Sequence, residues 1–148
     1  MKGIFTSVRG TPLIGVVGSL FAFLFGGWDT ALITLIIFMG FDYFTGLVVA
    51  GVFKVSKNSE NGALESKAGW KGLFRKGMTL LIVLIAYRLD LFIVSAFASD
   101  SGFVKDAVII AFIVNETISI IENAGLMGVP IPRAITQAID ILKKTGEN

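Results

Sequence analysis

Four apolar stretches, separated by short polar segments, are the feature that most constrains the fold of this chain. They run from Leu13 to Gly27, from Thr30 to Phe53, from Met78 to Phe97 and from Ala107 to Ile121. A transmembrane helix needs about 20 mostly apolar residues, with a range of roughly 17–25. The second and third stretches reach that length, whereas the first and fourth must borrow flanking residues or thin the bilayer. The sequence therefore predicts an all-α integral membrane protein.

Composition agrees with this class and excludes several functions. Apolar residues make up 54% of the 148 residues and charged residues only 16%, whereas soluble domains contain about 25% charged residues. Cysteine and histidine are both absent, which removes the thiol nucleophile, the commonest general base and the commonest metal ligand. The net charge of +2 is too small to indicate nucleic-acid binding. We predict no enzyme activity, no catalytic residue, no cofactor and no metal site.

The basic residues predict the orientation of a small bundle of four transmembrane helices at about 13–27, 30–53, 78–97 and 107–124. With four helices, eleven basic residues fall on one side, namely Lys2, Arg9, Lys54, Lys57, Lys67, Lys71, Arg75, Lys76, Arg133, Lys143 and Lys144. The turns on the other side contain only Lys105. The positive-inside rule then places both termini, the loop 54–77 and the tail 130–148 in the cytoplasm. The whole chain, 1–148, is expected to form one membrane domain.

The first apolar stretch allows other arrangements. It could be re-entrant or interfacial, because it is shorter than a full span. A cleaved signal peptide is not favoured, because no A-x-A-like site follows the stretch and a second apolar stretch begins at once.

The basic loop and the tail both carry features typical of a membrane surface. In the segment 64–76, apolar side chains alternate with basic ones, so the segment could lie in the headgroup layer or form a solvated loop. Its expected membrane-interface residues are Trp70, Lys71, Arg75 and Lys76. Beyond Pro130 and Pro132, five apolar residues at helical spacing predict a short amphipathic C-terminal helix on the inner leaflet: Ala134, Ile135, Ala138, Ile139 and Leu142.

Charged and amide side chains interrupt the apolar stretches. On a helix, Asn115, Ser119 and Glu122 share one face. With their neighbours and the charges of the other stretches, the candidate pore-lining or intramembrane polar residues are Asp42, Arg88, Asp90, Asn115, Glu116, Ser119, Glu122 and Asn123. A charge at the bilayer centre costs at least about 2.5–3.5 kcal/mol. We therefore expect Arg88 to pair with Asp42 or Glu116, and the other acids to be protonated, shared between subunits or hydrated.

Small residues recur every four positions on two of the expected helices. The first stretch has Gly18, Ala22 and Gly26, and the second has Gly46 and Ala50 on the face of Asp42. Because small residues let helices approach closely in lipid, these are candidate helix-packing residues.

Three segments resemble the toxin-secretion/phage-lysis holin family of bacteriophage holins. They are FDYFTG (41–46), KGLFRKGM (71–78) and NETISIIENAGLMGVPIPRAI (115–135), in this order along the chain. The resemblance implies a phage or prophage protein that oligomerises in the bacterial cytoplasmic membrane, with lipid and other copies of itself as partners. It also implies lesions that release an endolysin or a toxin without a necessary direct contact. Nothing in the resemblance implies a nucleic-acid partner.

The residues alone leave other functions open. A small ion or solute channel, or one subunit of a transporter, fits the same buried charges. A membrane scaffold or a toxin–antitoxin-like regulator would instead make the loop and the tail the active parts.

Overall fold

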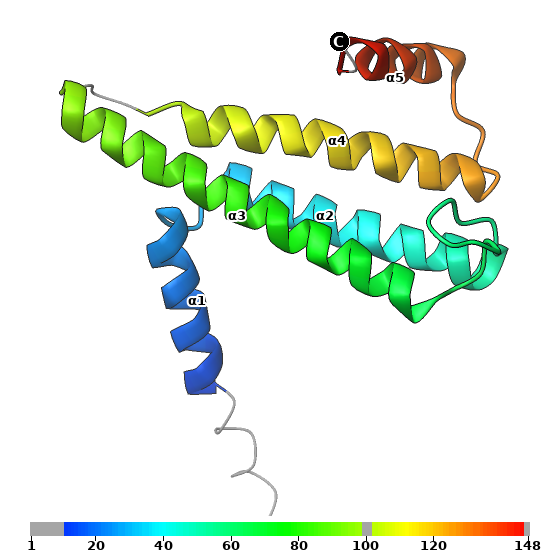
Figure 1. Ribbon diagram of the computed structural model, residues 1–148, viewed down its shortest axis with the longest axis horizontal. Coiled ribbons are helices and arrows are strands. Elements are labelled where there is room, and N and C mark those ends of the chain that lie inside the picture. The colour runs from blue at the N-terminus through cyan, green and yellow to red at the C-terminus, as the bar shows by residue number, and fades with distance from the viewer. Residues whose placement is uncertain (1–10, 99–101, 147–148) are drawn as a thin grey trace, which may run out of the picture.

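The structure is a computed structural model that describes residues 11–98 and 102–146, and all regular structure in these ranges is helical (Figure 1). The helices are α1 (Thr11–Phe25), α2 (Thr30–Val48), α3 (Ser66–Phe97), α4 (Val104–Leu126) and α5 (Arg133–Gly146). A π-helical turn, η1 (Val49–Phe53), continues α2 without a break. The predicted all-α class is confirmed.

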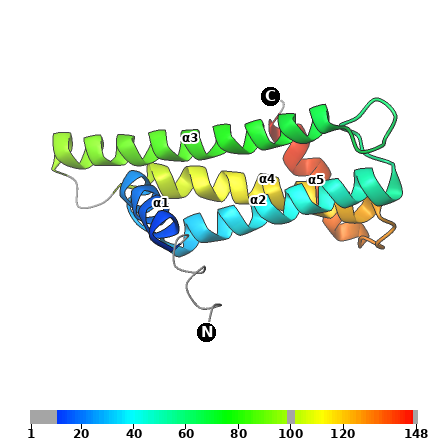
Figure 2. The ribbon, with the colours of Figure 1, turned by 90° about the horizontal axis from the view of Figure 1, so that it is seen from below.

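Three helices form the body of the molecule. α2, α3 and α4 run alongside one another, and α4 lies between the other two (Figure 2). Their core is apolar and includes Leu32 and Leu35 of α2, Val83 of α3 and Ile109 of α4. We call the end that carries the segment 54–65 the loop end, and the end where α2 and α4 begin the capped end.

α1 does not stand alongside the other three helices. It runs away from the bundle at a steep angle (Figure 1), and only its last turn enters the core, where Phe25 is buried. The rings of Phe21, Phe25 and Trp28 stack at this corner, with centroid distances of 4.2 and 4.8 Å. This geometry is that of a three-helix bundle with one transverse helix, so four parallel spans are not confirmed.

Two helical stretches in the described part of the chain are long and apolar enough to cross a membrane, 30–53 and 66–97. α1 is apolar but shorter. In the most apolar windows of the two stretches, only 22% and 17% of the residues are buried inside the molecule. A core helix of a soluble protein would be mostly buried. Here large side chains such as Phe44, Ile85 and Phe92 are exposed, as expected for helices whose outer faces contact lipid.

α3 begins much earlier than the sequence indicates. The loop predicted for 54–77 ends at Glu65, and the segment 66–77 is the first part of one continuous 32-residue helix. The segment 66–77 is therefore helical and not an irregular solvated loop, while its position in the headgroup layer stays a prediction. Strong helix formers such as Lys67, Leu73 and Arg75 favour the helix. Two of its three glycines, Gly69 and Gly72, lie against the side chain of Tyr43 on α2, where added Cβ atoms would be 3.6–3.7 Å away.

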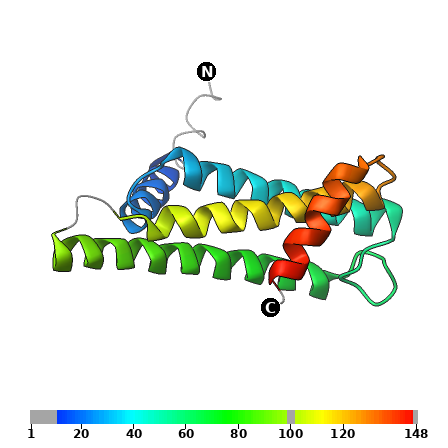
Figure 3. The same cartoon turned by 90° about the horizontal axis from the view of Figure 1, so that it is seen from above.

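The C-terminal helix forms where the amphipathic pattern predicts it. α4 ends at Leu126, and Gly128, with φ +86°, helps to turn the chain. Pro130 and Pro132 precede α5, since proline cannot continue a helix. α5 folds back and crosses α4 obliquely near the loop end (Figure 3).

Candidate functional site

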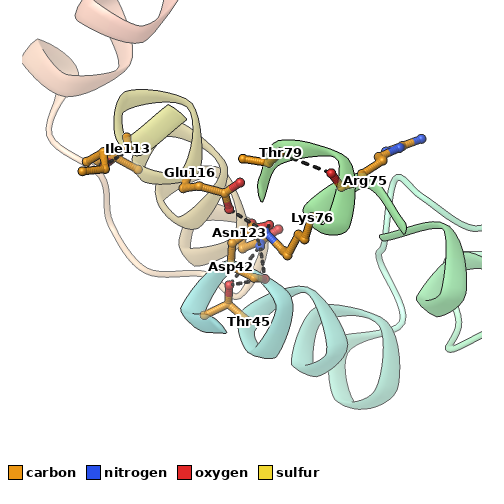
Figure 4. Close-up of polar contacts among 9 residues, drawn as sticks. Asp42, Thr45, Arg75, Lys76, Thr79, Ile113, Glu116 and Asn123 are labelled. Carbon is orange, nitrogen blue, oxygen red and sulfur yellow. Dashed lines mark hydrogen bonds and ion pairs between the residues drawn. The ribbon is translucent and has the colours of Figure 1, made fainter. Parts of the chain in front are cut away.

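A partly buried lysine joins the three helices of the bundle. Lys76 Nζ of α3 lies 2.8 Å from Asp42 Oδ2 of α2 and 2.6 Å from Glu116 Oε2 of α4 (Figure 4). The three side chains are 14%, 18% and 7% exposed. One cation thus binds two carboxylates from the two other helices.

An amide completes this cluster. Asn123 Nδ2 donates to Thr45 Oγ1 at 2.9 Å and to Asp42 Oδ1 at 3.3 Å. Both carboxylate oxygens of Asp42 therefore have partners. Gly46 faces the same amide, and a Cβ added there would be 3.8 Å from Asn123 Nδ2. The small residue lets α2 and α4 approach closely enough for these bonds.

The position of the acids within their helices explains why they need a cation. Asp42 and Glu116 lie in helix interiors, where each backbone N–H is already bonded within the helix. Only side chains, water or ions can bind such carboxylates, and an unpaired buried charge is strongly destabilising. Because Lys76 supplies one positive charge for two negative ones, the ion pairs leave one formal negative charge in the cluster.

This charge lies beside a cavity of about 280 Å³ near the loop end, bounded by α2, α3, α4 and the loop. Polar side chains that line it include Asp42, Lys76, Asn115, Glu116, Ser119 and Asn123. The volume admits several water molecules, and the polar walls offer them hydrogen-bond partners. The site can therefore hold a hydrated acidic group inside a bundle whose outer surface is mostly apolar.

The structure divides the polar residues predicted from sequence into three groups. Asn115, Glu116, Ser119 and Asn123 face the cavity together. Glu122 instead pairs with Lys143 of α5. Asp90 is buried at the capped end of the bundle.

The expected ion pair of Arg88 does not form. Within the described part of the chain, both of its candidate partners bind Lys76, while Arg88 is exposed on α3. Lys76, one of the predicted membrane-interface residues, instead points into the bundle, where it binds Asp42 and Glu116. The other three predicted interface residues, Trp70, Lys71 and Arg75, are exposed near the start of α3.

A second polar cluster, at the capped end, was not predicted. Asp90 of α3 accepts the backbone N–H groups of Val104 at 2.9 Å and Lys105 at 2.8 Å, and thereby caps α4. Lys105 Nζ donates to the carbonyl oxygen of Phe25 at 3.0 Å and also binds the carboxylate of Asp29. Asp29 in turn caps α2 by accepting the N–H of Leu32 at 2.8 Å. An Asp directly before an apolar run is the sequence signal for such a cap.

Electrostatics at this end favour the charged form of Asp29. Partial burial raises the pKa of Asp29, but the hydrogen bonds from Lys105 and Leu32 and the charge of Lys105 outweigh it, so the pKa lies below its usual value. The chain packs closely here. A Cβ at Gly102 would come within 2.4 Å of the Asp90 side chain.

The predicted small-residue faces have different surroundings. Gly26 lies beyond the end of α1 with φ +80°, and a Cβ there would be 2.5 Å from the ring of Tyr87. Gly18 has open space around it, and its carbonyl accepts the indole N–H of Trp28 at 3.2 Å. Ala22 is half-buried, and Ala50 is buried within η1.

Comparisons with known proteins give a consistent result. The sequence profile of the bacteriophage holin family matches residues 19–144. An uncharacterised protein of Halalkalibacterium halodurans is 38% identical over 86% of this chain and 89% of its own length. An uncharacterised protein of Clostridium perfringens is 36% identical over 94% and 93%, respectively. A probable holin of Bacillus phage phi105 is 30% identical over 68% of each chain. No solved structure matches.

Proposed function

Because the chain belongs to the bacteriophage holin family, we propose that it assembles in the bacterial cytoplasmic membrane into lesions. Through these lesions a cytoplasmic endolysin, or in some loci a toxin, leaves the cell. The family is pore-forming and not enzymatic, so the chain is not an enzyme.

The observation that carries the proposal is the contrast between the inside and the outside of the bundle. The outer faces of α2 and α3 are apolar and uncovered, which supports contact with lipid and with further copies. The polar face of α4 lines a cavity together with Asp42 and Lys76. Charged side chains inside a membrane cost free energy. A chain that served only as a membrane anchor would have no need of them. In an assembly, the same groups can contribute to a hydrated wall.

We place the loop end at the cytoplasmic face. The segment 54–65, the first turns of α3 and the helix α5 carry basic residues there, and basic residues are retained on the cytoplasmic side. Four crossings would put both termini in the cytoplasm, whereas a transverse α1 that does not cross would put the N-terminus outside.

The absence of native cysteine makes this topology testable. Single cysteines at Ser59 and Thr145 should be shielded from an impermeant thiol reagent in intact cells, while a cysteine at Ser101 should react. Shielding at Ser7 would support four crossings, and reaction at Ser7 would support three. Reaction at Ser59 from outside would overturn the proposed orientation.

The lesion itself is tested by what passes through it. The chain is expressed in a bacterium that also produces a cytoplasmic cell-wall hydrolase and a folded fluorescent protein. We expect abrupt lysis only when the chain and the hydrolase are both present, and release of the fluorescent protein once the wall is cut. If ions cross but lysis does not follow and the hydrolase stays inside, the chain is a small channel rather than a holin.

A further inference from the structure

α5 has an apolar arc that the described part of the molecule leaves mostly uncovered. At about 100° per residue, one continuous arc of the helix holds six apolar side chains. They are Ala134, Ile135, Ala138, Ile139, Ile141 and Leu142. The opposite side is polar, so α5 is strongly amphipathic.

Only one edge of this arc contacts the bundle. Ile139, at that edge, is buried, and the adjacent Lys143 pairs with Glu122 of α4. The centre and the far edge point elsewhere, since Ile141 is 65% exposed and Leu142 is 50% exposed. In Figure 3, α5 crosses α4 at an oblique angle.

The charges of α5 indicate what covers the arc. Arg133, Lys143 and Lys144 are basic, and Asp140 is the one acidic residue within the bounds of α5. Lys143 lies next to one edge of the arc, and the other two basic residues lie toward the opposite edge. An apolar face flanked by basic side chains is the pattern of helices that lie in an anionic lipid surface. Two copies facing each other would bring these like charges together.

We propose that the apolar arc of α5 binds the anionic phospholipid surface of the inner leaflet. The apolar side chains enter the boundary between headgroups and acyl chains, and the flanking basic groups bind lipid phosphates. Glu122 occupies the place beside Lys143 that a lipid phosphate takes. Since this ion pair is about half exposed, with side chains 50% and 36% accessible, it is weak. Lipid phosphates therefore compete with Glu122 for Lys143. The inference rests on the proposed insertion with the loop end at the cytoplasmic face.

The full chain in lipid vesicles tests this inference. A single cysteine replaces Ile141 in the arc or, as the matched control, Thr136 on the polar side, and each carries an environment-sensitive fluorophore. The vesicles are phosphatidylcholine, alone or with phosphatidylglycerol. We expect lipid-borne quenchers to act several-fold more strongly at position 141 than at 136. Phosphatidylglycerol should increase the difference, and salt or the pair Lys143→Gln and Lys144→Gln should reduce it.

Two results would overturn the inference. Equal quenching at both positions would show that the arc faces water. Shielding at 141 that rises with the protein-to-lipid ratio and ignores phosphatidylglycerol would show that a second copy covers the arc. Carbonate extraction and the lysis assay are run on the same variants. A chain that inserts and lyses without shielding at 141 would refute only this inference, whereas a chain that does not insert would refute the proposed function as well.

Discussion

Two lysines at opposite ends of the same bundle, Lys105 buried and Lys76 partly buried, are neutralised in different ways. At the capped end, Lys105 binds Asp29 and a backbone carbonyl, while the nearby Asp90 is satisfied by two backbone N–H groups. At the loop end, Lys76 alone binds two carboxylates. The first arrangement uses the free N–H groups at helix N-termini, which also favour negative charge. The second has no such groups to use.

From this difference we infer that the capped end serves folding, whereas the loop end serves function. At the capped end, Asp29 and Asp90 accept backbone N–H groups that would otherwise have no partner at the starts of α2 and α4. This role in folding is sufficient to explain why the two acids are there. Asp42 and Glu116 cap nothing, and beside the cavity two acids share one lysine. We therefore expect changes at the loop end to alter stability strongly or lysis specifically, and changes at the capped end to alter stability alone.

The largest effect should follow from Lys76→Met. It keeps the length of the side chain but leaves two buried carboxylates without their cation, a loss on the order of 3–5 kcal/mol. Because folded proteins are stable by only about 5–15 kcal/mol, the variant should accumulate poorly in the membrane, as measured by immunoblot, and should unfold at a lower temperature in detergent. Lys71→Met, on the exposed surface of the same helix, is the control and should behave like the wild type. Equal abundance of the two variants would show that the bundle does not need Lys76 to neutralise Asp42 and Glu116.

A smaller effect is expected for Asp90→Ala. It leaves two backbone donors in the first turn of α4 without their acceptor, a cost of roughly 1–3 kcal/mol. The melting temperature should fall, and the time to lysis at matched abundance should not change. Asp106→Ala, an exposed acid in the same first turn, serves as the control. If lysis timing changes at equal abundance, the capped end has a role in lysis, which would contradict the expectation that it affects stability alone.

The smallest effect on stability is expected for Glu116→Gln. Lys76 then pairs with Asp42 alone, so the cluster becomes neutral, and the stability should change by less than about 1 kcal/mol. The cavity loses its excess charge, and lysis should be delayed at normal abundance. Glu122→Gln makes the same chemical change on the same helix but outside the cavity. If both variants, or neither, delay lysis, the cavity is not the part of α4 that matters.

The sequence predicts the helices well because their signals are local. Apolar length, the prolines at 130 and 132 and the amphipathic spacing beyond them each act within a few turns. The polar stripe on α4 is predicted for the same reason, since helical periodicity alone brings Asn115, Glu116 and Ser119 to one face. The transverse position of α1 depends on tertiary contacts, such as the packing of Phe25, that no local pattern contains.

The cation at the site was missed for a related reason. Lys76 lies just before the apolar run that starts at Met78, among other basic residues, and a count of charges assigns it to the membrane surface. The helix propensity of the segment 66–77 favours the opposite conclusion. It extends α3 to Ser66 as one continuous helix, and this helix places Lys76 between α2 and α4. The excess of intramembrane acids over Arg88 predicts acids that are protonated, shared between subunits or hydrated, and it does not indicate Lys76 as their partner.

The most direct test of the account is whether removing the acids rescues the loss of the lysine. Lys76→Gln is combined with Asp42→Asn and Glu116→Gln, and membrane abundance is compared with that of Lys76→Gln alone and of Arg88→Gln. We predict that the single Lys76 variant is scarce, that the triple variant returns to nearly the wild-type level, and that Arg88→Gln is close to the wild type. A triple variant as scarce as the single one, or a scarce Arg88→Gln beside an abundant Lys76→Gln, would contradict the assignment of Lys76 as the cation that neutralises Asp42 and Glu116.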